Sequence, residues 1–136
     1  MSKIWGAICP IVGPNCVLCR AQGRNEMMVR IISAAAAAMS EDEFEHALRN
    51  LLNDLDLYGY HAHDSRRSAK GWPDWVIIGR QVLYRELKTE AGRLTAEQRH
   101  VGNLLIVANA DWKIWRPSDL LAGRVGAELA AITRGP

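Results

Sequence analysis

The sequence lacks the features that mark membrane, secreted and multidomain proteins. No apolar run approaches the roughly 20 residues that a membrane-spanning helix needs, and no basic segment followed by an apolar one signals secretion at the N-terminus. The 136 residues suffice for one core of ordinary domain size, and a net charge of +2 excludes a globally basic or acidic surface. We therefore expect a single-domain cytoplasmic protein in which any basic surface is local.

Cysteine is also scarce. Cys9, Cys16 and Cys19 are odd in number and crowded near the N-terminus, so they do not form a disulfide framework and they suit a reducing compartment. The spacing of Cys16 and Cys19 is that of a zinc ligand pair, and Cys9 offers a third thiolate, but no second pair completes the set. We favour reduced, unligated cysteines and leave zinc binding open.

Residues 1–38 differ in composition from the rest of the chain and predict an N-terminal extension. The segment closes with five consecutive alanines, Ala34 to Ala38. Because alanine is the best helix former, a helix is expected over 25–38. A run of alanines provides no amphipathic stripe for packing, so residues 39–136 are expected to form the globular domain without it.

From residue 40 onward the sequence predicts alternating helices and strands. Ser40 is a good N-cap, acidic residues fill the next turn, and apolar residues recur at helical spacing as far as Leu55. Gly79 and Arg80 predict a tight turn that pairs two strands antiparallel. The expected elements are a helix over 40–56, a strand beginning at Tyr60, strands 75–78 and 81–88, a helix from Thr95 to Asn109, a strand 112–115, and a helix from Ser118 to Arg134. This order is α-β-β-β-α-β-α, typical of an α/β fold with a mixed central sheet flanked by helices.

The chemically informative residues surround the predicted hairpin. Asp74 follows Pro73 at the start of one strand, and Glu86 and Lys88 alternate onto one face of the next. The hairpin brings Asp74 back beside Glu86, so two carboxylates and an ammonium group can share a site. Paired carboxylates are ligands for Mg²⁺ or Mn²⁺, and an adjacent lysine suits orientation of water or stabilisation of a phosphate oxygen. Each residue alone is more often turn chemistry or a solvated strand face.

The pattern Pro73-Asp74 followed by Glu86-x-Lys88 resembles the signature of the PD-(D/E)XK nuclease superfamily. Gly71 ahead of that pattern, the segment 86–98 and the segment 115–119 are similar to the virus-type replication-repair nuclease (VRR-NUC) branch in its small phage-encoded form. The resemblance covers residues 40–121, and it implies a restriction-endonuclease-like core, α-β-β-β-α-β. Here a C-terminal helix and the N-terminal extension are added to that core.

The resemblance also implies an acid on the first helix and a glutamine on the helix after the Glu-x-Lys strand. At about 100° per residue, Glu41 falls within the apolar stripe of the first helix and Glu45 lies at its edge, so Glu41 is preferred and Glu45 is held in reserve. Either acid could instead only favour the helix dipole. Gln98 matches the glutamine, yet Thr95-x-x-Gln98 also matches a capping box, and we expect these two roles to exclude each other. Contact of Gln98 with the site is preferred.

The implied activity is metal-dependent hydrolysis of DNA phosphodiester bonds in phage replication, recombination or repair, inside an infected bacterial cell. Branched, flap or junction DNA would be the substrate. Asp74, Glu86 and Glu41 would hold Mg²⁺ or Mn²⁺, which lowers the pKa of a bound water, and Lys88 would orient that water. The expected DNA contacts are Arg66, Arg67, Lys70, Arg93 and Arg99.

Two other classes of function stay open. A non-catalytic nucleic-acid-binding module of the same fold is the main alternative, and an interaction protein acting through the extension is the weaker one. The intact set of Asp74, Glu86 and Lys88 favours the enzyme, because a binding module has no physical need for acids that repel phosphate. DNA is the expected partner and a membrane is not. Cleavage of a junction would further require two active sites and hence a homodimer.

Overall fold

The computed structural model describes the backbone of residues 17–62 and 67–133, and it describes side chains from residue 24 onward. The elements are α1 (Val17–Ala38), α2 (Glu41–Asp54), β1 (Tyr58–His61), β2 (Trp75–Ile78), β3 (Val82–Leu87), α3 (Ala96–Val107), β4 (Asp111–Trp115), α4 (Pro117–Leu121) and α5 (Arg124–Ile132). This order confirms the expected α/β pattern. Within the described ranges, no helix combines the length and the apolar character needed to cross a membrane.

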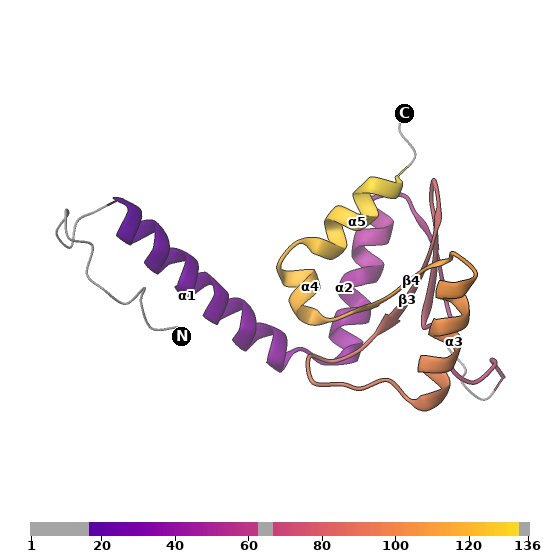
Figure 1. Cartoon of the computed structure of the whole chain (residues 1–136). Coiled ribbons are helices and arrows are strands. Elements are labelled where there is room, and N and C mark those ends of the chain that lie inside the picture. The colour runs from indigo at the N-terminus through magenta and orange to yellow at the C-terminus, as the bar shows by residue number, and fades with distance from the viewer. Residues whose placement is uncertain (1–16, 63–66, 134–136) are drawn as a thin grey trace.

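The strands form one mixed sheet in the order β1-β2-β3-β4. The β2–β3 hairpin is antiparallel as predicted, with Ile78 opposite Val82 across the turn, and β1 also pairs antiparallel with β2. Strand β4 pairs in parallel with β3, which requires a crossover connection, and α3 provides it. Helices lie on both sides of the sheet, with α2, α4 and α5 on one side and α3 on the other (Figure 1).

The hydrophobic core lies between the sheet and the layer of α2, α4 and α5. Trp75 and Arg85 are opposite in register and face this core. Because side chains alternate across a strand, Tyr84 and Glu86 face the α3 side. The core residues are Phe44, Leu48, Leu52, Trp75, Ile77, Leu83, Leu87, Trp115, Val125, Leu129 and Ile132.

The N-terminal helix corrects two expectations. Helix α1 begins at Val17 rather than near residue 25, and its alanine run does pack, because Ala36 is fully buried and α1 contacts α4. A small side chain allows two helices to approach closely, so a single alanine can serve as a contact without any apolar stripe. Met27 and Met28 are exposed where the helix extends away from the body of the molecule (Figure 1).

The C-terminal segment is also different from its prediction, since α4 and α5 replace a single helix. Gly123 between them has a φ of 78°, a left-handed conformation that glycine adopts without steric penalty. Helix α4 begins at Pro117, one residue before the expected cap at Ser118, because proline fits the first turn of a helix. The side chain of Asp119 accepts a hydrogen bond from the backbone N–H of Arg116 at 2.9 Å and closes that turn.

The first strand begins earlier than expected, at Tyr58, so Gly59 lies inside β1 rather than before it. The turn that precedes the strand is made by Asp56, which has a φ of 51°. Gly59 is needed for space, because a Cβ there would lie 2.6 Å from Leu52 and 2.9 Å from Trp75. The glycine therefore permits close contact between α2 and the sheet.

Candidate functional site

The β2–β3 hairpin brings Asp74 and Glu86 together. Asp74 lies directly before β2, and its Oδ2 accepts a hydrogen bond from the backbone N–H of Leu87 at 2.8 Å. That contact fixes the carboxylate at the end of the strand pair. The Asp74 carboxylate lies close enough to act on the ionisation of Glu86 through both its charge and a side-chain hydrogen bond. The predicted juxtaposition of the two acids is therefore present.

Glu86 is a buried acid, with 1% of its surface exposed. Its Oε1 lies 2.7 Å from Nζ of Lys88 and accepts a hydrogen bond from Nε2 of Gln98 at 2.5 Å. Burial raises the pKa of Glu86 to about 7, Lys88 partly offsets this rise, and the charge of Asp74 adds to it. A strongly shifted carboxyl that has a specific charged partner is typical of functional sites.

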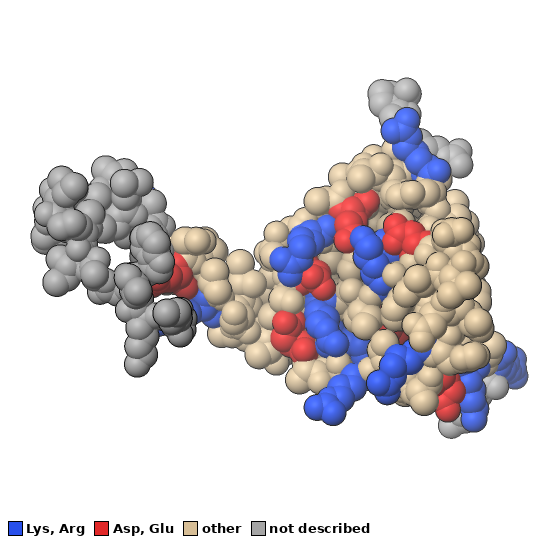
Figure 2. Space-filling model, in the orientation of Figure 1, with Lys and Arg blue, Asp and Glu red and all other residues tan. Residues whose placement is uncertain are grey.

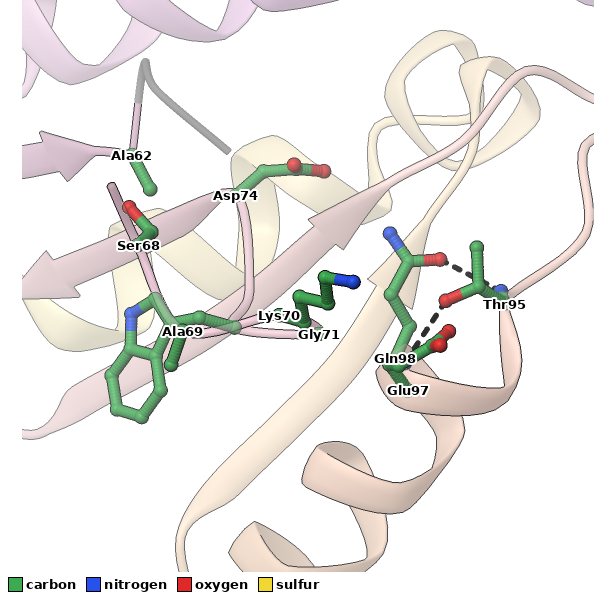
Figure 3. A pocket seen from close by; sticks show the side chains of 10 residues that line it. Ala62, Ser68, Ala69, Lys70, Gly71, Asp74, Thr95, Glu97 and Gln98 are labelled. Carbon is green, nitrogen blue, oxygen red and sulfur yellow. Dashed lines mark hydrogen bonds between the residues drawn. The ribbon is translucent and has the colours of Figure 1, made fainter. Parts of the chain in front are cut away.

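Gln98 fills both of the roles that we expected to exclude each other. Its Oε1 accepts a hydrogen bond from the backbone N–H of Thr95 at 2.9 Å, and Oγ1 of Thr95 accepts one from the backbone N–H of Gln98 at 3.2 Å. These two bonds complete a capping box (Figure 3). The expectation was wrong because a carboxamide carries its acceptor and its donors on different atoms. Nε2 therefore remains available for Glu86.

A cleft of about 350 Å³ lies between the loop before β2 and the first turn of α3. Asp74 and Gln98 extend toward it from opposite walls, and Lys70 points toward the α3 wall (Figure 3). The cleft is lined by Ala62, Ser68, Ala69, Lys70, Gly71, Trp72, Asp74, Thr95, Glu97 and Gln98. The acid pair, which we define as Asp74 and Glu86, is thus accessible to a ligand on the Asp74 side.

Gly71 determines how closely the loop approaches α3. Its φ is 83°, and a Cβ at this position would lie 2.3 Å from the carbonyl oxygen of Glu97. Both the left-handed conformation and the backbone contact exclude a larger residue. The glycine ahead of Pro73 therefore has a physical role, which is to hold one wall of the cleft against the other.

The basic residues predicted to contact DNA are spread around the cleft. Lys70 is exposed and lines it. Arg93 and Arg99 are exposed beside the first turn of α3, and Nη2 of Arg99 lies 3.5 Å from the carbonyl oxygen of Leu94. Arg67 is exposed on the loop, and Arg66 lies outside the described residues. Their roles in DNA binding stay predictions.

The helix acids do not join the acid pair. Glu41 is exposed in the first turn of α2, and within the described part of the chain no three His, Cys, Asp or Glu side chains converge as metal ligands. Oε1 of Glu45 instead lies 2.6 Å from Nη2 of Arg49 and 3.5 Å from Nδ1 of His61. A catalytic role for either acid stays a prediction.

Asp74 and Glu86 fit a divalent cation. Contacts with Leu87, Gln98 and Lys88 orient the two carboxylates, which together offer oxygen ligands of the kind that such an ion prefers. Mg²⁺ is commonly bound through one or two carboxylates together with water. The zinc question is separate, because Cys9 and Cys16 lie outside the described residues and the side chain of Cys19 is not described.

Two arginines to which the sequence assigned no role make extensive polar contacts. Nη1 of Arg116 donates hydrogen bonds to the carbonyl oxygens of residues 89, 90 and 92 at 2.6, 3.2 and 2.9 Å, which fixes the loop after Lys88. Arg85 is fully buried and pairs with Asp111 at 3.0 Å and with Glu128 at 2.9 Å. Strand alternation could have revealed Arg85 as a charged residue at a core position. Arg116 lies in the segment 115–119 of the motif resemblance, but no local pattern predicts its contacts with the loop.

Searches with family models, among curated proteins and among solved structures find no match to the chain. The class of protein is therefore described by its fold and by the geometry of its site. It is an α/β protein with a four-stranded mixed sheet, helices on both sides, and a pair of acids at the edge of a cleft.

Proposed function

We propose that the chain is a Mg²⁺- or Mn²⁺-dependent DNA nuclease with a restriction-endonuclease-like core of the VRR-NUC type. The observation that carries the proposal is Glu86, a buried acid beside Asp74 that is held by Lys88 and Gln98 next to an open cleft. Burial of an acid next to another acid opposes folding, and Lys88 offsets only part of the resulting rise in the pKa of Glu86. The arrangement is therefore better explained by ligand binding than by stability.

Asp74 and Glu86 are the residues that would hold the cation. When bound there, a divalent ion supplies a Lewis acid for the phosphate and lowers the pKa of the attacking water. Nζ of Lys88 lies 2.7 Å from Oε1 of Glu86. From this position it can orient that water and balance charge on a phosphate oxygen. Gln98 keeps Glu86 in position through its amide.

The same proposal places the activity in phage DNA replication, recombination or repair in an infected bacterial cell. Support comes from the motif resemblance, which extends along the chain through the observed α-β-β-β-α-β order of α2 to β4. Branched, flap and junction DNA are the candidate substrates. Action on a junction would require a homodimer, because two strands must be cut.

The test is incubation of the full chain with single-stranded, duplex, flap and four-way-junction DNA in Mg²⁺, Mn²⁺ or EDTA. Cleavage is expected with either metal and not with EDTA. Lys88→Met should lower kcat by about 10²- to 10⁴-fold, the usual contribution of a positioned proton-transfer group, and Glu86→Gln should abolish cleavage.

Two matched substitutions control for loss of charge alone. Lys113→Met replaces a half-exposed lysine on β4 that does not line the cleft, and Asp42→Asn replaces an exposed acid on α2. Both should cleave like the wild type. Undiminished cleavage by Glu86→Gln would refute the assignment of the site. Metal-independent DNA binding without any cleavage would instead favour the non-catalytic module.

A further inference from the structure

Helix α3 covers only part of its side of the sheet. It packs against β4, where Gly102 is so close to the Trp112 ring that a Cβ would lie 2.6 Å from it. The same side of the sheet at β1 and β2 is open, because Tyr58, Tyr60 and Ile78 are 65%, 53% and 41% exposed. The solvent-facing side of an antiparallel sheet ordinarily carries polar side chains, so these large exposed residues call for an explanation.

All three tyrosines of the chain lie on this open side. Tyr60 is opposite Val76 in register, and Val76 is opposite Tyr84, so the two tyrosines lie in one row across three strands with Val76 between them. Trp72 packs edge-on against Tyr84, with ring centroids 6.0 Å apart and planes at 90°. We define the aromatic face as Tyr58, Tyr60, Trp72 and Tyr84.

The aromatic face is continuous with the acid pair. Tyr84 and Glu86 lie on the same side of β3, about 7 Å apart along the strand at the usual rise per residue. Trp72 lines the same cleft as Asp74. A strand of nucleic acid with its phosphate at the acid pair would therefore place its neighbouring bases over the aromatic rings.

The charges around the aromatic face also suit a nucleic acid. The strand residues that face this side between the turn and the acid pair are Tyr58, Tyr60, Val76, Ile78, Val82 and Tyr84, and none of them is acidic. Exposed cations lie at both ends, with Lys70 in the cleft and Arg80 in the hairpin turn. A strand surface that carries tyrosines and no acid, with a cation near each end, fits flat bases joined by phosphates.

We propose that the aromatic face stacks the unpaired bases of a DNA strand that enters the cleft, so that the substrate is DNA with a single-stranded segment beside the cleavage point. This inference rests on the proposed nuclease function and names its substrate class. Aromatic side chains stack bases without sequence preference. Duplex DNA keeps its base faces inside the helix and cannot use these rings, which gives a basis for discrimination.

The test measures binding by fluorescence anisotropy with the full wild-type chain in EDTA. The probes are labelled 15-residue oligothymidine, a blunt duplex of equal length, and that duplex with an oligothymidine overhang. The single-stranded and overhang probes should bind more tightly than the blunt duplex. Tyr60→Ala should weaken binding of these two probes at least about fivefold, the lower end of base stacking on one aromatic residue, with the salt dependence unchanged.

Matched variants separate stacking from other effects. Tyr60→Phe keeps the ring and should bind like the wild type, whereas equal weakening by Tyr60→Phe and Tyr60→Ala would overturn stacking. Val107→Ala shortens an apolar residue that is 82% exposed on α3 and should change nothing. Tyr58→Ala, at a position that is 65% exposed, repeats the measurement should Tyr60→Ala fail to fold.

The outcomes distinguish this inference from the proposed nuclease activity. If Tyr60→Ala loses affinity for single strands and the wild type cleaves no DNA with any metal, the aromatic face is supported and the nuclease activity is rejected. Normal cleavage and normal single-strand binding by Tyr60→Ala would do the reverse. A dimer seen by light scattering that Tyr60→Ala dissociates would also overturn the inference, because a second copy would then cover the face.

Discussion

Arg85 and Glu86 are adjacent on β3 and lie in opposite charge environments. Arg85 faces the core, where carboxylates of Asp111 and Glu128 neutralise it. Glu86 faces the α3 side, where the only described cation at ion-pair distance is Lys88 and a second acid lies nearby. The first arrangement contributes to the fold. The environment of Glu86 is unfavourable for folding, which is typical of a functional site.

The stability of the metal-free protein should depend on the ionisation of Glu86. Its pKa is raised in the folded state from 4.5 to about 7, so the folded protein holds this proton more tightly than the unfolded chain does. The resulting stability is fully present below pH 4.5 and is lost as the pH rises through about 7. Relative to Glu86→Gln, the wild type should lose up to about 3 kcal/mol between pH 5 and pH 8.

Urea unfolding of both proteins in EDTA at a series of pH values measures this difference. Asp42→Asn is the control, and its unfolding free energy should follow that of the wild type at every pH. Mg²⁺ should restore stability at pH 8 in the wild type more than in Glu86→Gln, because only the carboxylate is a strong ligand. Parallel pH profiles for the wild type and Glu86→Gln would contradict a raised pKa.

At the scale of elements, Gly71 joins the loop to α3. We predict that Gly71→Ala destabilises the protein by about 1–3 kcal/mol, since it combines an unfavourable φ with a backbone clash. It should also lower cleavage activity, because the clash displaces the first turn of α3, which carries Gln98. The measurements are the unfolding free energy and kcat.

Gly126→Ala is the matched control. This glycine lies in α5, and a Cβ there would meet nothing within 4 Å. Replacement by alanine should stabilise the helix by up to about 1 kcal/mol and leave kcat unchanged. Equal effects of the two substitutions would show that the contact between the loop and α3 is unimportant.

A second prediction for the elements concerns the ion pairs that attach α5 to the sheet. Glu128→Ala should destabilise the protein by about 1–3 kcal/mol, because it removes a charged hydrogen bond from an arginine that has no access to water. Arg85→Met should be less damaging than Glu128→Ala. It removes the buried charge itself and keeps apolar contact with Trp115, over which the guanidinium now lies at 4.9 Å.

Urea denaturation of both variants gives the comparison. The acids left behind by Arg85→Met can be hydrated, since Asp111 and Glu128 side chains are 34% and 31% exposed. Lys113 also remains 3.3 Å from Glu128. A larger loss of stability in Arg85→Met than in Glu128→Ala would show that the buried pair is a net source of stability.

Local patterns were sufficient for those elements whose signals are local. The β2–β3 hairpin follows from its turn residues and strand alternation, and the starts of α2 and α3 follow from capping boxes at Ser40 and Thr95. The packing of Ala36 depends on α4, which is distant in sequence, and the break between α4 and α5 depends on the left-handed conformation of Gly123. No periodicity carries that information.

At the scale of the whole molecule, some residues of the site follow from local sequence signals and others depend on how the elements pack. Asp74, Glu86 and Lys88 were predictable because one hairpin carries them. The exposure of Glu41 depends on how α2 sits against the sheet, and periodicity alone placed this residue within the apolar stripe. The exposure of the tyrosines was not predictable either, because it depends on how much of the sheet α3 covers.

The net charge of +2 results from nearly equal numbers of basic and acidic residues. Figure 2 shows basic and acidic side chains interleaved on the viewed face rather than separated into patches of one sign. With 17 basic and 15 acidic residues in the chain, we expect DNA affinity to come from a small number of phosphate contacts next to the cleft. This predicts a shallow dependence of DNA affinity on salt.

Single cations near the cleft should each account for a measurable part of that dependence. For duplex DNA, Lys70→Ala and Arg99→Ala should each reduce the slope of log K against log salt by about 0.9, the value for one phosphate contact. Arg30→Ala removes an exposed cation from α1 and should leave the slope unchanged. The measurement is anisotropy between about 50 and 200 mM salt in EDTA. An equal reduction in all three variants would mean that DNA responds to total charge, and the cleft would then lose its status as the DNA-binding site.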